Sequence, residues 1–122
     1  MALIKKKIKI ATILPYKENY TFKKASAASL WVAEFYKKSK FKKNNYIFGF
    51  KKSKNYLTKN YKNIYLNSLK SKFKSTTNEY VKKLTKLIYN KFDIVEIHNR
   101  PLILFELLKK INSRFIFYFH ND

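Results

Sequence analysis

The chain contains only two histidines, His98 and His120, and an asparagine follows each of them. Each histidine ends a short run, residues 93–98 and 115–120, that is rich in β-branched and aromatic side chains, as buried β-strands are. Residues 101–111 carry apolar side chains at helical spacing, so the whole stretch predicts a strand, a crossover helix and a second parallel strand. Open parallel sheets bind ligands at the carboxyl ends of their strands. We therefore predict that the two histidines lie together at a functional site.

Histidine can act as a general acid or base, as a ligand contact or as a metal ligand. We predict no metal site, because the chain has no cysteine and no third histidine, and Asp122 is its last residue. A strand-end histidine that only bonds a nearby carbonyl is the simpler alternative for either residue alone. Two histidines in equivalent positions favour a shared site.

Other side chains are predicted at the same end of the sheet. Glu18 follows the first strand, and Arg100 can bind a carboxylate or phosphate or can only solvate its loop. Ser26 is predicted to cap a helix, and the small residues Ala27 and Ala28 after it would let an anion approach the free amides there. The alternative is that both alanines pack against the sheet.

The remaining elements predict one α/β domain over residues 1–122. Strands are expected at residues 8–14, 46–50 and 64–66 in addition to the two above, and helices at 26–38, 77–90 and 101–111. Their order predicts a doubly wound, Rossmann-like, three-layer parallel sheet with strands 8–14, 93–98 and 115–120 adjacent. The apolar face of the first helix is predicted to be Ala27, Leu30, Trp31, Phe35 and Ala28.

Composition excludes several classes of protein. Apolar residues make up 46% of the 122-residue chain, no apolar run approaches a membrane span, and the amino terminus is not a signal peptide. We therefore expect a cytoplasmic protein. The single glycine, Gly49, excludes a glycine-rich phosphate loop, so no cofactor is predicted and a dinucleotide enzyme or kinase is disfavoured.

The net charge of +21 leaves two interpretations open. All but two of the 28 basic residues are lysine, and the abundance of residues with AT-rich codons favours a solvated lysine surface. The alternative is a small basic module that binds nucleic acid or an anionic membrane. Such a module needs exposed aromatic side chains among its lysines, whereas most aromatics here fall at predicted core positions. No specific nucleic acid is therefore expected.

Four segments together resemble a known family: LPYKENY (14–20), SLWV (29–32), DIVEIHNRP (93–101) and FHND (119–122). In order and spacing they resemble the amino-terminal half-domain of GT-B glycosyltransferases, in particular the large retaining family of lipopolysaccharide and cell-wall sugar transferases. The resemblance spans nearly the whole chain. It implies half of a two-domain enzyme, with this half on the acceptor side.

The resemblance also implies roles for individual residues. The loop of residues 16–28 would line the cleft near the sugar diphosphate, although alanines stand where that loop usually carries glycines. His120 matches a catalytic histidine that contacts the transferred sugar, and residues 98–100 would face the acceptor. The predicted substrate-binding residues are Tyr16, Glu18, Ser26, Ala27, His98, Asn99, Arg100, Asn121 and Asp122.

The partners that the resemblance implies are a glycan or lipid-linked acceptor and a carboxy-terminal domain that binds the nucleotide sugar. Because the chain stops two residues after its last predicted strand, we expect it to be incomplete at that end and inactive alone. A peripheral position on the inner face of the membrane is compatible with both the acceptor and the charge.

Overall fold

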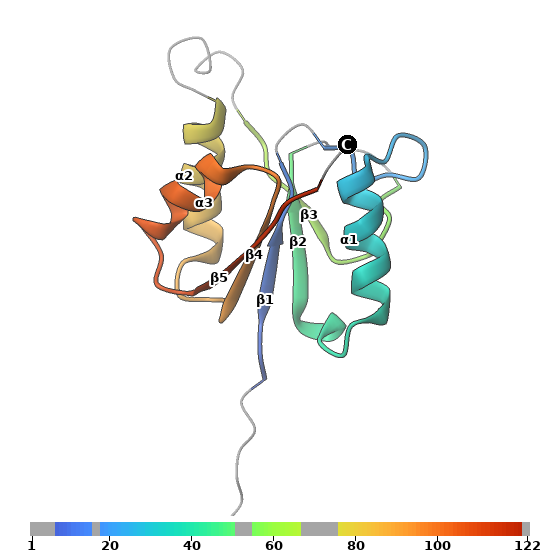
Figure 1. Ribbon diagram of the computed structural model, residues 1–122, viewed down its shortest axis with the longest axis horizontal. Helices are drawn as coiled ribbons and strands as arrows, with labels where there is room; N and C mark the ends of the chain where they lie inside the picture. Colours follow the sequence, from blue (N-terminus) through green and yellow to red (C-terminus); the bar gives the residue numbers. More distant parts are fainter. Residues whose placement is uncertain (1–6, 16–17, 51–54, 67–75, 121–122) are drawn as a thin grey trace, which may run out of the picture.

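A five-stranded parallel sheet forms the centre of the molecule, with helices on both of its faces (Figure 1). The computed structural model describes residues 7–15, 18–50, 55–66 and 76–120. The strands are β1 (Ile10–Ile13), β2 (Asn45–Gly49), β3 (Tyr61–Asn63), β4 (Ile94–His98) and β5 (Arg114–Tyr118). The helices are α1 (Ala27–Lys38), α2 (Thr76–Ile88) and α3 (Pro101–Leu108), with a short 3-10 turn, η1 (Lys42–Asn44).

The strand order is β3-β2-β1-β4-β5, and every neighbouring pair is parallel. The predicted adjacency of the first strand, the 93–98 strand and the 115–120 strand is confirmed. From β1 the chain adds β2 and β3 on one side of that strand, and then adds β4 and β5 on the other side of β1. The topological switch point therefore lies between β1 and β4. This architecture is compatible with a Rossmann-like fold.

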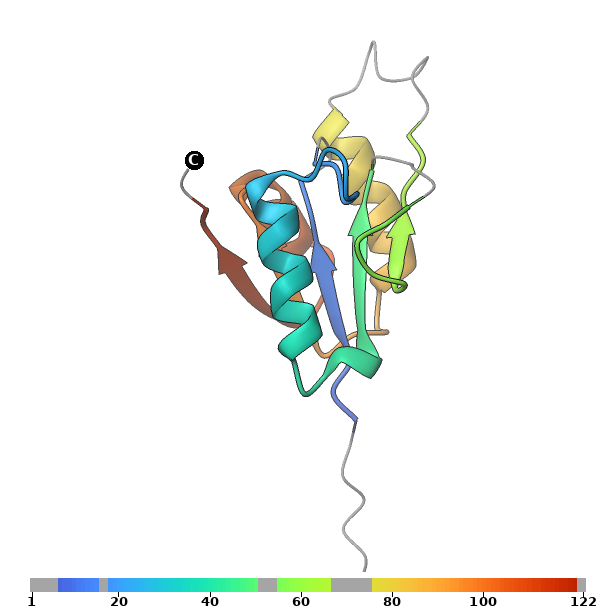
Figure 2. The ribbon, with the colours of Figure 1, turned by 90° about the vertical axis from the view of Figure 1, so that its right-hand side faces the viewer.

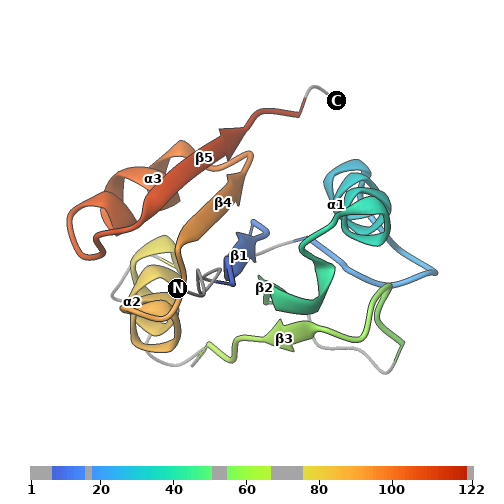
Figure 3. The same cartoon turned by 90° about the horizontal axis from the view of Figure 1, so that it is seen from below.

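Three layers result from this order. Figures 2 and 3 show α1 on one face of the sheet and α2 with α3 side by side on the other. The side chains that alternate along β1 serve both faces: Ile13 packs with α2 and α3, whereas Leu14, directly after the strand, packs with α1. No described helix is long and apolar enough to span a membrane.

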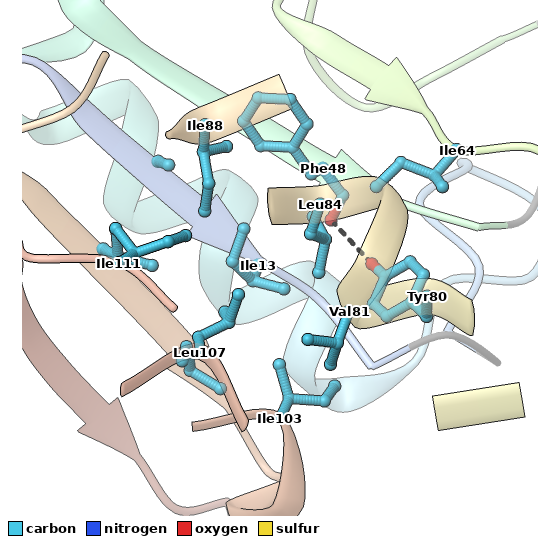
Figure 4. Close-up of a cluster of buried hydrophobic side chains, with 13 residues drawn as sticks. Ile13, Phe48, Ile64, Tyr80, Val81, Leu84, Ile88, Ile103, Leu107 and Ile111 are labelled. Atoms are coloured by element: carbon cyan, nitrogen blue, oxygen red, sulfur yellow. Dashed lines mark hydrogen bonds between the residues drawn. The ribbon is translucent and has the colours of Figure 1, made fainter. Parts of the chain in front are cut away.

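The helix α2 buries the face that its spacing predicts. Tyr80, Val81, Leu84 and Ile88 lie in the larger core cluster, which Figure 4 draws. The Tyr80 hydroxyl donates to the Leu14 carbonyl at 2.8 Å and lies 3.5 Å from the Phe48 carbonyl, so this buried phenol has a hydrogen-bond acceptor.

The predicted apolar face of α1 is wrong in most of its members. The helix buries Ala28, Ser29, Val32 and Ala33 against the sheet, whereas Leu30, Trp31 and Phe35 are exposed. Both sets recur at helical spacing, but the first is made mainly of small side chains. Small side chains let the helix axis approach the sheet closely, which excludes the bulky stripe from the contact.

Two further predictions need correction. The third strand is Tyr61–Asn63 rather than residues 64–66, because the pairing with β2 begins opposite Ile47 at Tyr61; Ile64 follows the strand and is still buried. The expectation that most aromatic side chains are in the core is also wrong. Of the aromatic side chains that the structure describes, only Tyr20, Phe48, Tyr61 and Tyr80 are buried. The exposed ones are Phe22, Trp31, Phe35, Phe41, Tyr46, Tyr65, Tyr89, Phe105 and Phe119.

Gly49, at the end of β2, has a packing role. A Cβ atom added there would lie 2.8 Å from Cε2 of Tyr61 and would also clash with the Tyr61 hydroxyl. We expect Gly49→Ala to lower the free energy of unfolding by about 2 kcal/mol, as overpacking in a core does. Urea unfolding checks this, and the double variant Gly49→Ala/Tyr61→Leu should lose less than the sum of the two single losses. Full additivity would show that the two positions do not interact.

Candidate functional site

The two histidine rings lie against each other at the carboxyl ends of β4 and β5. Nδ1 of His98 and Nε2 of His120 are 2.7 Å apart, and the rings are stacked with centroids 5.0 Å apart. His98 is 1% exposed, whereas His120 is half-buried. His98 ends β4, the strand next to the switch point, and His120 follows β5 beside it, where the parallel-sheet pattern predicts a ligand site.

Asn99 links the end of β4, which carries His98, to the segment after β5, which carries His120. Its Oδ1 accepts a hydrogen bond from the His120 backbone N–H at 2.6 Å, and its own backbone N–H donates to the Tyr118 carbonyl at 2.9 Å. Asn99 has a φ of 62°, in the left-handed region that asparagine tolerates better than most residues. This turn directs the chain away from the sheet after His98 and fixes the start of the segment that holds His120.

An aromatic cluster surrounds the pair. Trp31 of α1 lies 5.5 Å from His98, 5.3 Å from His120 and 5.0 Å from Tyr118, measured between ring centroids. Tyr118 pairs with His98 in the strand register and stacks on its ring at 4.8 Å. Trp31 is 38% exposed, so part of this aromatic surface faces solvent beside His120.

A buried polar network lies below the histidines on the same face of the sheet. Glu96 is 6% exposed and accepts hydrogen bonds from Thr12 at 2.8 Å and from Tyr118 at 3.1 Å. The Thr12 hydroxyl also lies 3.0 Å from Oδ1 of Asn45. Two hydroxyl donors satisfy the carboxylate, and one of them, Tyr118, also packs on His98, so the network holds the aromatic cluster in place.

Burial sets the protonation of the site. Burial, and secondarily the neighbouring His120, lowers the pKa of His98 from 6.5 to about 3, so this imidazole is neutral at pH 7. Burial, with the adjacent Glu96 carboxylate, raises the pKa of Tyr118 from 10.0 to about 12, so its hydroxyl remains a donor. The site at neutral pH therefore contains a neutral buried histidine and a neutral phenol.

The contact between the rings couples their tautomers. The nitrogens that face each other need one donor and one acceptor, so when His98 donates, His120 must accept, and the reverse. The tautomer of His120 in turn decides whether its other nitrogen, Nδ1, is a donor or an acceptor. A ligand hydroxyl can both donate and accept, so it can pair with either state of this nitrogen.

The other predicted residues are distributed around this end of the sheet. Ser26 caps α1, as predicted, by accepting from the Ser29 N–H at 3.1 Å. Ala27 is exposed in the first turn, one turn before Trp31 and on the same side of the helix. Glu18 lies in the loop after β1, and its N–H donates to the Pro15 carbonyl.

The structure does not bring every predicted residue into the histidine cluster. Arg100 is exposed and directly precedes α3, and its side chain does not cap that helix. Tyr16, Asn121 and Asp122 lie outside the described residues. Among the residues that the structure describes, no three His, Cys, Asp or Glu side chains form a group that could hold a metal ion.

Sequence reasoning missed three members of the cluster. The apolar spacing of the first helix predicts Trp31 in the core, and neither Glu96 nor Tyr118 is among the predicted site residues. The residue spacing points to two of them. Glu96 and His98 are two positions apart in one strand, and Tyr118 and His120 are two positions apart at the end of the next strand. Side chains two positions apart in a strand lie on the same face of the sheet, so each of these residues shares a face with a histidine. For Trp31 the side of α1 that meets the sheet had to be known.

The Asn99 contacts allow a stability test. We expect Asn99→Ala to lower the free energy of unfolding by about 2 kcal/mol, because it removes the bond to the His120 N–H and places alanine at a left-handed φ. Asn99→Asp retains both the acceptor and the tolerance for this φ, so it should lose much less. Chemical denaturation measures both, and equal losses would contradict the role of the Oδ1 acceptor.

Comparison with known proteins gives no relative from which a function could be transferred. No protein-family model matches the sequence, and no curated protein or solved structure is significantly similar to the chain.

Proposed function

We propose that this chain is the acceptor-side, Rossmann-like half of a GT-B glycosyltransferase, in which His120 contacts the sugar that is transferred. The complete enzyme would move a sugar from a nucleotide-sugar donor to a glycan or a lipid-linked acceptor. The observation that carries the proposal is the pairing of His98 and His120 at the carboxyl ends of two adjacent parallel strands, beside the switch point.

The chemistry of the cluster suits a sugar. Sugar rings present hydroxyls at their edges and apolar C–H groups on their faces, so sites for them combine flat aromatic surfaces with a few polar groups. Trp31 supplies an exposed aromatic surface 5.3 Å from the His120 ring, and Nδ1 of His120 supplies a hydrogen-bonding atom.

The proposal assigns nucleotide binding and acceptor binding to two different domains, because of a motif that the sequence lacks. The chain has no glycine-rich phosphate loop, so a second domain is proposed to bind most of the nucleotide. The first turn of α1, in which Ala27 is exposed one turn before Trp31, is proposed to contribute backbone amides to the diphosphate. The 122 residues alone are then expected to transfer no sugar.

A second function, nucleic-acid binding, has support from the nine aromatic side chains that are exposed among the described residues, contrary to the sequence-based expectation. Exposed aromatics among lysines are a feature of nucleic-acid-binding modules. Lysine point charges bind phosphates without reading bases, so such binding should be weak, should fall steeply with salt and should ignore sequence. A preference of about 1,000-fold for one sequence would favour this alternative over the glycosyltransferase.

Trp31 provides a direct test of the glycosyltransferase proposal, because it is the only tryptophan in the chain and belongs to the cluster. Titration of the chain with a panel of nucleotide sugars and oligosaccharides should give a saturable change in tryptophan fluorescence with at least one of them. The change should be lost in His120→Ala and retained in Tyr65→Ala, which removes an exposed aromatic ring elsewhere. A panel without any saturable response, or an equal response from His120→Ala, would contradict the proposal.

A further inference from the structure

The outward surface of α2 and α3 combines exposed apolar side chains with lysines. On α3, Leu102 is 61% exposed, Phe105 is 54% exposed and Leu108 is 51% exposed. These residues recur every three positions, so they form a stripe along the outside of the helix, opposite the buried Ile103 and Leu107. An apolar stripe of this kind on an eight-residue helix is not explained by the packing of the domain.

Lysines border this stripe on the side of α2. A surface hollow of about 520 Å³ between the helices is lined by both of them, and four of its lining residues are lysines: Lys82, Lys83, Lys86 and Lys110. Glu79 and Glu106 also line it, and Glu106 is held by Lys109 at 3.3 Å. With Lys109 included, the lysines outnumber the glutamates, and the surface is positively charged.

We propose that this α2–α3 surface, made of Leu102, Phe105 and Leu108 with the lysines around them, binds the chain to an anionic lipid membrane. Apolar side chains on one helix that are bordered by lysines match the boundary between lipid headgroups and acyl chains. The net charge of +21 complements the negative potential of an anionic leaflet. The apolar stripe would enter the boundary region while the lysines contact the headgroup phosphates.

A lipid surface fits this stripe better than a nucleic acid does. Two of its three apolar residues are leucines, which cannot stack on bases, and neither α2 nor α3 contains an arginine. Helices α2 and α3 also lie on the opposite face of the sheet from α1, as Figure 3 shows, and Trp31 belongs to α1. A chain bound to a membrane through α2 and α3 would therefore leave the histidine cluster accessible.

Vesicle co-sedimentation tests the assignment. The purified chain should bind vesicles that contain about one-third phosphatidylglycerol, should bind pure phosphatidylcholine vesicles much more weakly, and should lose affinity as salt is raised. The double variant Leu102→Ser/Phe105→Ser should bind the anionic vesicles about tenfold more weakly, because two inserted apolar side chains are lost.

A matched control variant distinguishes binding through this surface from non-specific binding by any exposed apolar side chains. Phe22→Ser/Leu30→Ser removes one exposed phenylalanine and one exposed leucine in the same way, but Leu30 is on α1, across the sheet. It should bind as the unchanged chain does. For the charges, Lys82→Gln/Lys86→Gln should weaken binding more than Lys38→Gln/Lys42→Gln, although both variants lose two positive charges.

The results that overturn the proposal are specific. They are failure to bind the anionic vesicles at about 0.1 M salt, or equal losses from the test and control pairs. Tighter binding to a nucleic-acid oligomer that depends on the lysines but not on Leu102 and Phe105 would assign the surface to nucleic acid instead. Circular dichroism of each variant confirms that it is folded, which is expected because all the substituted side chains are exposed.

Discussion

His120→Ala is expected to reduce kcat of the proposed two-domain glycosyltransferase by about a hundredfold, the loss that follows removal of one well-placed donor to a transition state. Nε2 of His120 is 2.7 Å from Nδ1 of His98, so the proposed contact with a sugar hydroxyl is assigned to the other nitrogen, Nδ1. If that contact strengthens as charge develops on the transferred sugar, kcat falls more than KM rises. Steady-state kinetics of the purified enzyme measures both.

Two companion variants make this result interpretable. His120→Gln retains a side chain that can donate and accept, so it should recover part of the lost kcat. Phe119→Ala changes the neighbouring residue, which is 72% exposed and has no assigned role, so it should leave kcat close to normal. Normal turnover by His120→Ala would remove His120 from the proposed site. A rise in KM alone would assign it to substrate binding without a role in the transition state.

The second large effect expected is a loss of stability in mild acid that depends on His98. The folded chain keeps this imidazole neutral down to a pKa of about 3, whereas the unfolded chain protonates it near 6.5. Stability from this residue is therefore complete above about pH 6.5 and falls as the pH drops below it, because only the unfolded state takes up the proton. One proton corresponds to 1.36 kcal/mol per pH unit, so about 2 kcal/mol should be lost between pH 6.5 and 5.

Urea unfolding measured across this pH range gives the slope directly. His98→Gln has no titrating group at this position, so its stability should depend less on pH by about one proton, whatever its absolute stability is. His120→Gln keeps His98 buried and should retain most of the slope, since burial is the main cause of the lowered pKa. An unchanged slope in His98→Gln would show that other groups cause the acid sensitivity.

The order of the elements could be predicted because its signals are local. Alternating or continuous apolar runs mark strands, three- and four-residue spacing marks helices, and right-handed crossovers restrict how parallel strands are arranged. These rules were sufficient to place β1, β4 and β5 side by side and to bring the two histidines to one edge. They were weaker for β3, a three-residue strand whose position depends on its pairing with β2.

What the sequence by itself determined was thus the parallel α/β sheet, its switch point and the placing of His98 and His120 at its carboxyl end. Only the tertiary structure decided which stripe of α1 meets the sheet. Two stripes had suitable spacing, and the one with small side chains was buried because it allows closer packing, which left Trp31 to join the histidines. The tertiary structure also decided that Glu96 is buried between Thr12 and Tyr118, because those hydroxyls come from neighbouring strands far away in the sequence.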